Sequence, residues 1–86
     1  MTEQIDYSAI AARCGTNAAT IVKALQAGDW GGGSTALIME LTGLGYRPTL
    51  RALHRLKAAT FADQCESFMS RFGWGINYHR LPQIAA

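Results

Sequence analysis

Residues 9–25 read AIAARCGTNAATIVKAL. This stretch holds two short helical patterns separated by Gly15, at the spacing of a helix-turn-helix. Ala11 is small enough to let two helices cross closely, Gly15 can adopt the left-handed conformation of a turn, and Ile21 can fill the angle between the helices. The stretch therefore predicts a helix-turn-helix in the N-terminal half of the chain, an arrangement that many DNA-binding proteins use.

Apolar periodicity and capping residues predict further helices along the chain. The expected segments are a helix-turn-helix core at about 6–45, a basic helix at about 48–58 and an aromatic-rich C-terminal helix at about 60–73. Glycines 31–33 are expected in a loop without regular structure, and the alternation at 74–78 predicts a short C-terminal strand. We expect an all-α fold, a small helical domain of about four to five helices.

The composition is that of a small globular domain. The 86 residues are 49% hydrophobic and 16% charged, which predicts a single domain over residues 1–86 with one modest core. Because such a small core gives marginal stability, we expect a homodimer. Two cysteines, Cys14 and Cys65, could form at most one disulfide, so we expect reduced thiols and a cytoplasmic location. No apolar run approaches about 18 residues and no signal-peptide pattern is seen, so no membrane association is expected.

The charge of the chain is unevenly distributed. The formal net charge is +2, but six of the eight Lys and Arg residues follow Gly43 in the sequence. Four of them fall within residues 47–57, namely Arg47, Arg51, Arg55 and Lys57. Such a cluster favours nucleic acid or an acidic protein surface as a partner, although a basic run is also common on a solvated helix face.

Three segments of the chain follow one another in a recognisable order. They read IAARCGTNAATIVKAL at 10–25, MELTGLGYRP at 39–48 and TLRALHRL at 49–56. This order resembles the DNA-binding headpiece of the lactose and galactose repressor family, over roughly residues 8–57. In that family a helix-turn-helix precedes a helix that closes in a leucine-glycine-tyrosine-x-proline phrase, present here at 44–48, and then a hinge helix. The family's effector-binding domain has no counterpart in this sequence, so we expect no small-molecule induction.

The resemblance implies two sets of DNA-contacting residues. The helix after Gly15 would be the recognition helix in the major groove, and its base-contacting residues would be Asn17, Ala18, Ala19, Thr20 and Lys23. The residues on phosphates or in the minor groove would be Arg13, Arg47, Arg51, Arg55 and Lys57. Since alanine cannot hydrogen-bond to a base, most of the affinity would come from phosphate contacts. If Lys23 also contacted a phosphate, the six cations together would make log affinity fall with log salt at a slope of about −5.

An aromatic-rich stripe follows the basic segment. Its members Phe61, Phe68, Phe72 and Trp74 form either a dimer surface or part of the core of one monomer. The role of Trp30, which stands beside the glycines at 31–33, is left open by the sequence.

The sequence predicts a small DNA-binding transcriptional regulator of the helix-turn-helix type that binds double-stranded DNA. The alternative is a small helical protein-protein interaction module, of the phage or plasmid inhibitor or adaptor type, without DNA binding. We expect no enzymatic activity, cofactor or metal, because no nucleophile motif is present. His54 and His79 also lack partners at ligand spacing.

Overall fold

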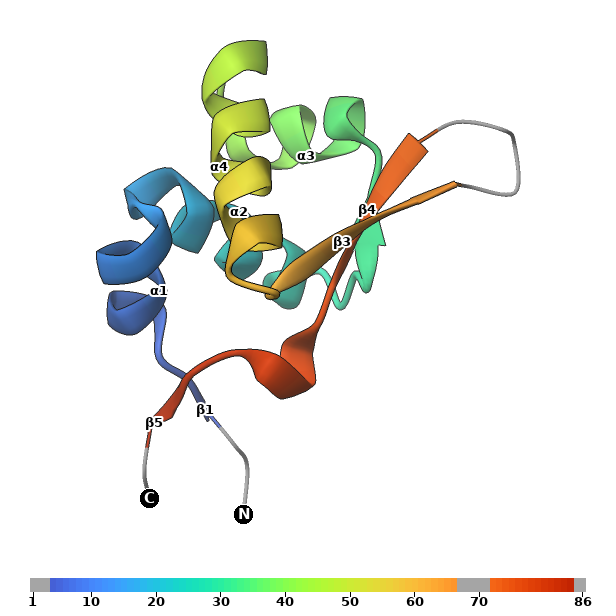
Figure 1. Cartoon of the computed structure of the whole chain (residues 1–86). Helices are drawn as coiled ribbons and strands as arrows, with labels where there is room; N and C mark the ends of the chain where they lie inside the picture. Colours follow the sequence, from blue (N-terminus) through green and yellow to red (C-terminus); the bar gives the residue numbers. More distant parts are fainter. Residues whose placement is uncertain (1–3, 67–71, 85–86) are drawn as a thin grey trace.

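A computed structural model describes residues 4–66 and 72–84. The elements are, in order, β1 (Gln4–Ile5), α1 (Tyr7–Cys14), α2 (Thr16–Ala27), β2 (Gly32–Gly33), α3 (Thr35–Thr42), α4 (Tyr46–Ala58), β3 (Ala62–Glu66), β4 (Phe72–Ile76), the 3-10 helix η1 (Tyr78–Arg80) and β5 (Gln83–Ile84). The protein is therefore α+β, and the predicted all-α fold is wrong. The helices of the first two-thirds of the chain pack beside a small sheet (Figure 1).

Side-chain caps begin two of the helices. The backbone N–H of Ala9 donates to Asp6 Oδ1 at 3.1 Å at the start of α1, and that of Leu37 donates to Ser34 Oγ at 3.1 Å at the start of α3. Each cap satisfies a backbone donor that the first turn of a helix leaves without a partner. Helix α2 differs, because it follows Gly15 directly and no side chain caps its first turn.

The main sheet has three antiparallel strands in the order β2-β4-β3. Trp74 in β4 lies opposite Gly33 on one side and Gln64 on the other. The short C-terminal strand expected near residue 74 is thus the centre of this sheet, and both of its partners belong to the same chain (Figure 1). The two neighbouring strands give β4 backbone hydrogen-bond partners along both edges.

The predicted aromatic helix at 60–73 is wrong. Helix α4 ends at Ala58, and Thr60 then adopts a left-handed φ of 66° that breaks the helical path. The chain continues as β3, which pairs with β4 from Ala62 to Glu66. The spacing of four, three and four residues along Phe61, Cys65, Phe68 and Phe72 therefore does not mark a helix here, because strand pairing overrides the local pattern.

The glycines at 32 and 33 form a strand, not the expected irregular loop. A Cβ atom at Gly32 would overlap the carbonyl oxygen of Trp74, and one at Gly33 would lie 2.6 Å from Leu37 Cδ2. The absence of side chains therefore lets β2 approach both β4 and α3 closely.

The core lies between the helices and β4. Its fully buried large side chains include Ile10, Ile21, Val22, Leu25, Ile38, Leu53 and Leu56. Phe61 and Trp74 also belong to it, with only 4% and 2% of their surfaces exposed. These two aromatic residues stabilise the monomer and are not available as a dimer surface. Phe68 and the side chain of Phe72 lie outside the described residues.

A second, two-stranded sheet joins the ends of the described chain. Strands β1 and β5 pair antiparallel, with Gln4 opposite Ile84, and the N–H of Asp6 donates to the carbonyl oxygen of Pro82 at 2.8 Å. This sheet lies at the opposite end of the molecule from α3 (Figure 1). Within the described residues, no helix has the length and apolar character needed to span a bilayer.

Candidate nucleic-acid interface

Helices α3 and α4 are joined by a short turn. Only residues 43–45 separate the end of α3 at Thr42 from the start of α4 at Tyr46. Gly43 has a φ of 76° and its N–H donates to the carbonyl oxygen of Met39 at 2.8 Å, which closes α3 with a left-handed turn. A three-residue turn that contains glycine between two helices is typical of a helix-turn-helix. The two helices predicted on either side of Gly15 are also present, as α1 and α2.

Helix α4 has one buried and one basic face. Its buried residues are Thr49, Ala52, Leu53 and Leu56, and the Thr49 hydroxyl donates to the carbonyl oxygen of Gly45 at 2.7 Å. Arg47 and Arg51 are exposed, and their spacing of four places them one turn apart on the side away from the core. His54 is exposed as well, but its ring packs edge-on against Trp74, with ring centroids 5.3 Å apart. Helix α4 therefore presents a row of two arginines to solvent.

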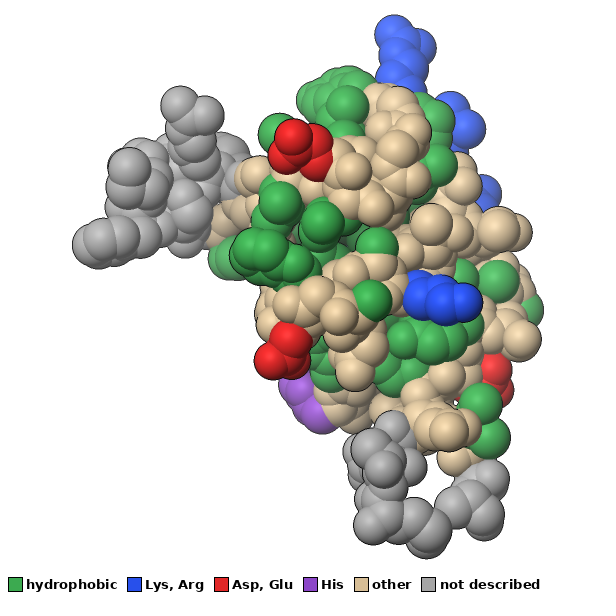
Figure 2. All heavy atoms as spheres, turned by 180° about the vertical axis from the view of Figure 1, so that it is seen from behind, with side chains coloured by type: hydrophobic (Ala, Val, Ile, Leu, Met, Phe, Trp, Pro, Cys, Tyr) green, Lys and Arg blue, Asp and Glu red, His purple; other side chains and the backbone are tan. Residues whose placement is uncertain are grey.

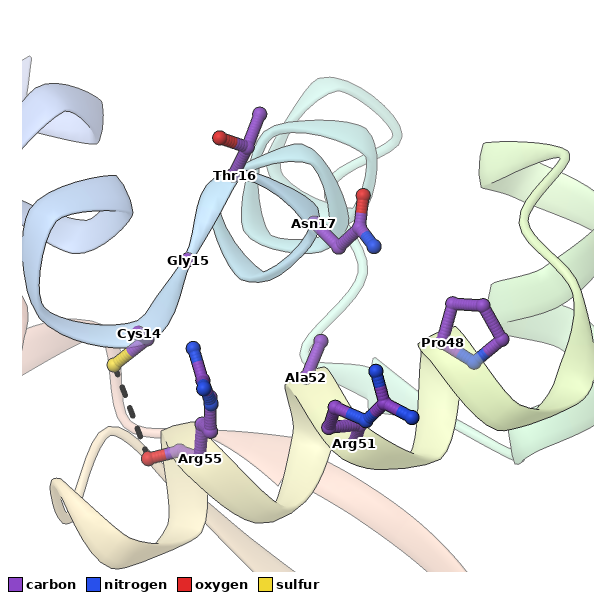
Figure 3. A pocket seen from close by; sticks show the side chains of 8 residues that line it. All are labelled: Cys14, Gly15, Thr16, Asn17, Pro48, Arg51, Ala52 and Arg55. Carbon is purple, nitrogen blue, oxygen red and sulfur yellow. Dashed lines mark hydrogen bonds between the residues drawn. The ribbon is translucent and has the colours of Figure 1, made fainter.

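Two further cations flank this row. Lys57 Nζ donates to Gln64 Oε1 at 3.2 Å on the side of β3, and Arg55 extends toward the junction of α1 and α2 (Figure 3). No acidic residue occurs between positions 41 and 62 of the sequence. Viewed from behind, much of the visible face consists of hydrophobic and uncharged groups with some Asp or Glu side chains, and Lys or Arg side chains project at its upper right edge (Figure 2). The stretch around α4 thus carries positive charge without a neighbouring acidic residue in the sequence.

A pocket of about 240 Å³ lies between α4 and the junction of α1 and α2. Its lining residues are Cys14, Gly15, Thr16, Asn17, Pro48, Arg51, Ala52 and Arg55, none of which is acidic. The Arg55 side chain points toward Gly15, and Arg51 lies one turn along α4 beside Pro48 (Figure 3). A Cβ atom on Gly15 would lie 3.3 Å from Arg55 Nη1, and Gly15 has a φ of 99° that other residues rarely adopt.

Cys14 lies at the base of this pocket but is not suited to nucleophilic chemistry. Its side chain is 2% exposed, and its thiol donates to the carbonyl oxygen of Arg55 at 3.8 Å. Burial raises the pKa of Cys14, and the positive charges of Arg13 and Arg55 offset part of that effect. The thiol therefore stays protonated near neutral pH, as expected for a buried structural cysteine.

The residues predicted to contact bases do not form one surface. Ala18 is fully buried and Ala19 is 9% exposed, because both pack into the core, so the expectation that their methyl groups touch DNA is not compatible with this structure. Asn17 lines the pocket, whereas the Thr20 hydroxyl donates to the carbonyl oxygen of Thr16 at 3.1 Å. Lys23 is exposed further along α2.

The residues predicted to contact phosphates divide into two groups. Arg47, Arg51, Arg55 and Lys57 all belong to α4. The fifth, Arg13, lies on α1 at 5.1 Å from the centre of the Phe61 ring. Lys23, which was predicted to contact bases, lies 6.0 Å from the centre of the Tyr7 ring. The predicted basic segment is helix α4, which begins directly after the glycines at 43 and 45.

No protein family, curated protein or solved structure matches the chain. Within the described part of the chain, no group of three or more His, Cys, Asp or Glu residues is placed to hold a metal ion. The interface is therefore interpreted from its geometry and charge.

Proposed function

We propose that the protein binds double-stranded DNA by inserting α4 into the major groove. The observation that carries this proposal is that α4, which follows α3 after a three-residue turn, carries four exposed Lys and Arg side chains. The major groove is about 12 Å wide and admits an α-helix. In helix-turn-helix proteins, the second helix occupies this position.

The strands that follow α4 support the same docking. The order α2-β2-α3-α4-β3-β4, with β4 between β2 and β3, is the arrangement of a winged helix-turn-helix, in which a β-hairpin flanks the recognition helix. Trp74 of this hairpin contacts His54 of α4 with ring centroids 5.3 Å apart. The hairpin therefore packs against α4, and in the proposed complex it would lie beside the DNA groove.

Two kinds of contact follow from the positions of the cations. Arg47 stands in the first turn of α4 on its outward side, where a guanidinium can donate two hydrogen bonds to a guanine. Arg51, Arg55 and Lys57 would neutralise phosphates. Three phosphate contacts, without Arg13, Lys23 and the base-contacting Arg47, give an expected slope of log affinity against log salt of about −2.7, shallower than the six-cation expectation.

A fluorescence-anisotropy titration of a random-sequence duplex tests this proposal. The variant carrying Arg47→Gln, Arg51→Gln and Arg55→Gln is expected to lose affinity by on the order of 100-fold at low salt. The matched control carries Arg13→Gln, Lys23→Gln and Arg80→Gln, which removes the same charge from other elements. It should retain most of the wild-type affinity. No binding by the wild type, or equal losses in both variants, would overturn the proposal.

As a transcriptional regulator, the protein would use this surface to occupy a site on duplex DNA. Phe61 and Trp74 of the aromatic stripe are buried, so these two residues cannot form a dimer surface. A mass measurement on the DNA complex gives the number of chains bound, and two chains on a symmetric site would support a homodimer.

A protein partner is the second candidate. Leu41 and Tyr46, at the two ends of the turn between α3 and α4, have 40% and 58% of their surfaces exposed. If these two side chains belong to one contiguous apolar patch, that patch is a site for contact with another protein. Unchanged duplex affinity in the Arg47, Arg51 and Arg55 variant would favour this candidate over DNA.

A further inference from the structure

We propose that the pocket between α4 and the α1–α2 junction holds one phosphate of the DNA backbone, clamped by Arg51 and Arg55. This inference rests on the proposed function and assigns a specific part of the DNA to a specific part of the protein. The ligand chemistry is a phosphate anion, and the source is a phosphodiester next to the groove that α4 occupies.

Two positively charged side chains line the pocket. Arg51 and Arg55 are four residues apart on α4, so their side chains are neighbours on the helix surface, and both line the pocket. Like charges at this spacing repel each other, and none of the other lining residues is acidic. A bound anion removes this repulsion and accepts hydrogen bonds from both guanidinium groups. Arginine suits phosphate because its planar donors can pair with two oxygens at once.

The backbone on the other side of the pocket fits the same ligand. Gly15 leaves open the space beside Arg55, because a Cβ atom there would come within 3.3 Å of Nη1. Helix α2 then begins at Thr16 without a capping side chain, so its first amides are free to donate to an anion. Asn17 extends from the α2 side of the pocket and faces α4 across it (Figure 3).

The position of the pocket relative to α4 indicates which phosphate it would hold. Arg51 lies on the exposed side of α4 one turn after Arg47 and also lines the pocket. When Arg47 reaches a base, the pocket lies at the side of the same helix, toward the border of the groove where a DNA backbone runs. The clamp would therefore fix the register of α4 in the groove, the role that phosphate contacts have in DNA recognition.

A phosphate-neutralisation scan tests the clamp. Duplexes that each carry one uncharged methylphosphonate linkage are titrated against the wild type, Arg51→Gln, Arg55→Gln and Arg55→Lys. The wild type should lose about 10-fold in affinity at one linkage that borders the α4 site. For each glutamine variant, the affinity for the duplex modified at that linkage should equal its affinity for the unmodified duplex. Arg55→Lys, which keeps the charge, should retain part of the difference.

The control variant is Arg80→Gln, which removes an exposed cation from η1 and should show the wild-type scan. Circular dichroism confirms that each exposed-residue variant is folded. If the wild type binds no duplex, the proposed function fails. If the wild type binds, but every methylphosphonate linkage weakens the two glutamine variants as much as it weakens the wild type, then only the proposed clamp is wrong.

A further arm of the experiment distinguishes a backbone phosphate from free phosphate. Inorganic phosphate and chloride are compared as competitors of the unmodified duplex at equal ionic strength. If the pocket holds a phosphodiester within DNA, inorganic phosphate and chloride should displace the duplex to the same extent. Stronger displacement by inorganic phosphate, absent in Arg55→Gln, would assign the pocket to free phosphate and overturn the backbone assignment.

Discussion

The indole of Trp74 and the imidazole of His54 meet at an interplanar angle of 90°, with ring centroids 5.3 Å apart. The same indole donates from Nε1 to Thr35 Oγ1 at 3.1 Å. One side chain on the central strand β4 therefore contacts both α3 and α4. This arrangement makes the relative position of α3 and α4 dependent on β4.

Replacing Trp74 by alanine should strongly destabilise the fold. The substitution removes a side chain that is only 2% exposed, and such changes cost about 3–5 kcal/mol of unfolding free energy. Trp30→Ala is the matched control, because that indole is 43% exposed and should cost much less. Urea unfolding followed by circular dichroism measures both. Equal losses in the two variants would contradict the assignment of Trp74 to the core.

Two adjacent glycines should respond differently to alanine. A Cβ at Gly32 would overlap the carbonyl oxygen of Trp74, so Gly32→Ala should separate β2 from β4 and lower the midpoint of thermal unfolding by several degrees. At Gly31 nothing lies within 4 Å of the added Cβ, and Gly31→Ala should leave the midpoint unchanged or slightly raised. A midpoint that falls as far for Gly31→Ala as for Gly32→Ala would show that β2 is not held against β4.

Tyr78 should make stability fall at alkaline pH. Burial raises the pKa of Tyr78 above its ordinary value of 10.0, and Tyr7 and Asp29 act in the same direction. Its hydroxyl donates to the carbonyl oxygen of Trp30 at 2.6 Å. Because the folded protein holds this proton more tightly than the unfolded chain, the contribution is complete below about pH 10 and is lost as pH rises through the folded-state pKa.

The measurement for Tyr78 is the unfolding free energy in urea between neutral pH and about pH 11.5. Tyr78→Phe should be less stable than the wild type at neutral pH by about 0.5–1.5 kcal/mol, because a hydrogen bond is lost, and should show a shallower alkaline decline. Tyr46→Phe, which alters an exposed ring, is the control. A decline in Tyr78→Phe as steep as in the wild type would exclude Tyr78 as its source.

Arg47 should determine base preference, in contrast to Arg55. In a selection from random duplexes, the wild type should enrich a guanine at one position, and Arg47→Gln should lose that preference, worth about 1–3 kcal/mol. Arg55→Gln should weaken binding to all sequences alike and make the salt slope shallower by about 1. Replacing the selected guanine with 7-deazaguanine, which lacks the N7 acceptor, should reproduce the loss in the wild type only. An unchanged preference in Arg47→Gln would remove Arg47 from base recognition.

Helix ends with side-chain or glycine signals could be predicted from the sequence. Asp6 and Ser34 cap α1 and α3, and Gly43 closes α3, and each is a residue type that favours its position. The basic helix was also predicted, within two residues of the observed start at Tyr46. These features depend on hydrogen bonds and backbone conformations within a few residues, which local sequence encodes.

Strands β2 and β3 could not be predicted in the same way, although a short strand was expected near residue 74. Strand β2 consists of two glycines, so it has no side-chain pattern to detect, and its role depends on a partner about forty residues later in the chain. The burial of two residues predicted to contact bases depends on tertiary structure in a related way. Ala18 and Ala19 suited an exposed reading surface and close packing between helices equally well, and only the tertiary structure shows that they are buried.

Strand β4 comes last of the three strands along the chain and yet lies between the other two. Because Phe72–Ile76 is translated after Gly32–Gly33 and Ala62–Glu66, neither β2 nor β3 can form its pairing in the main sheet until β4 has been made. A chain interrupted before β4 would contain every arginine of the basic helix but would lack Trp74, the side chain that contacts both α3 and α4. The order of translation thus makes completion of this sheet one of the last steps of folding.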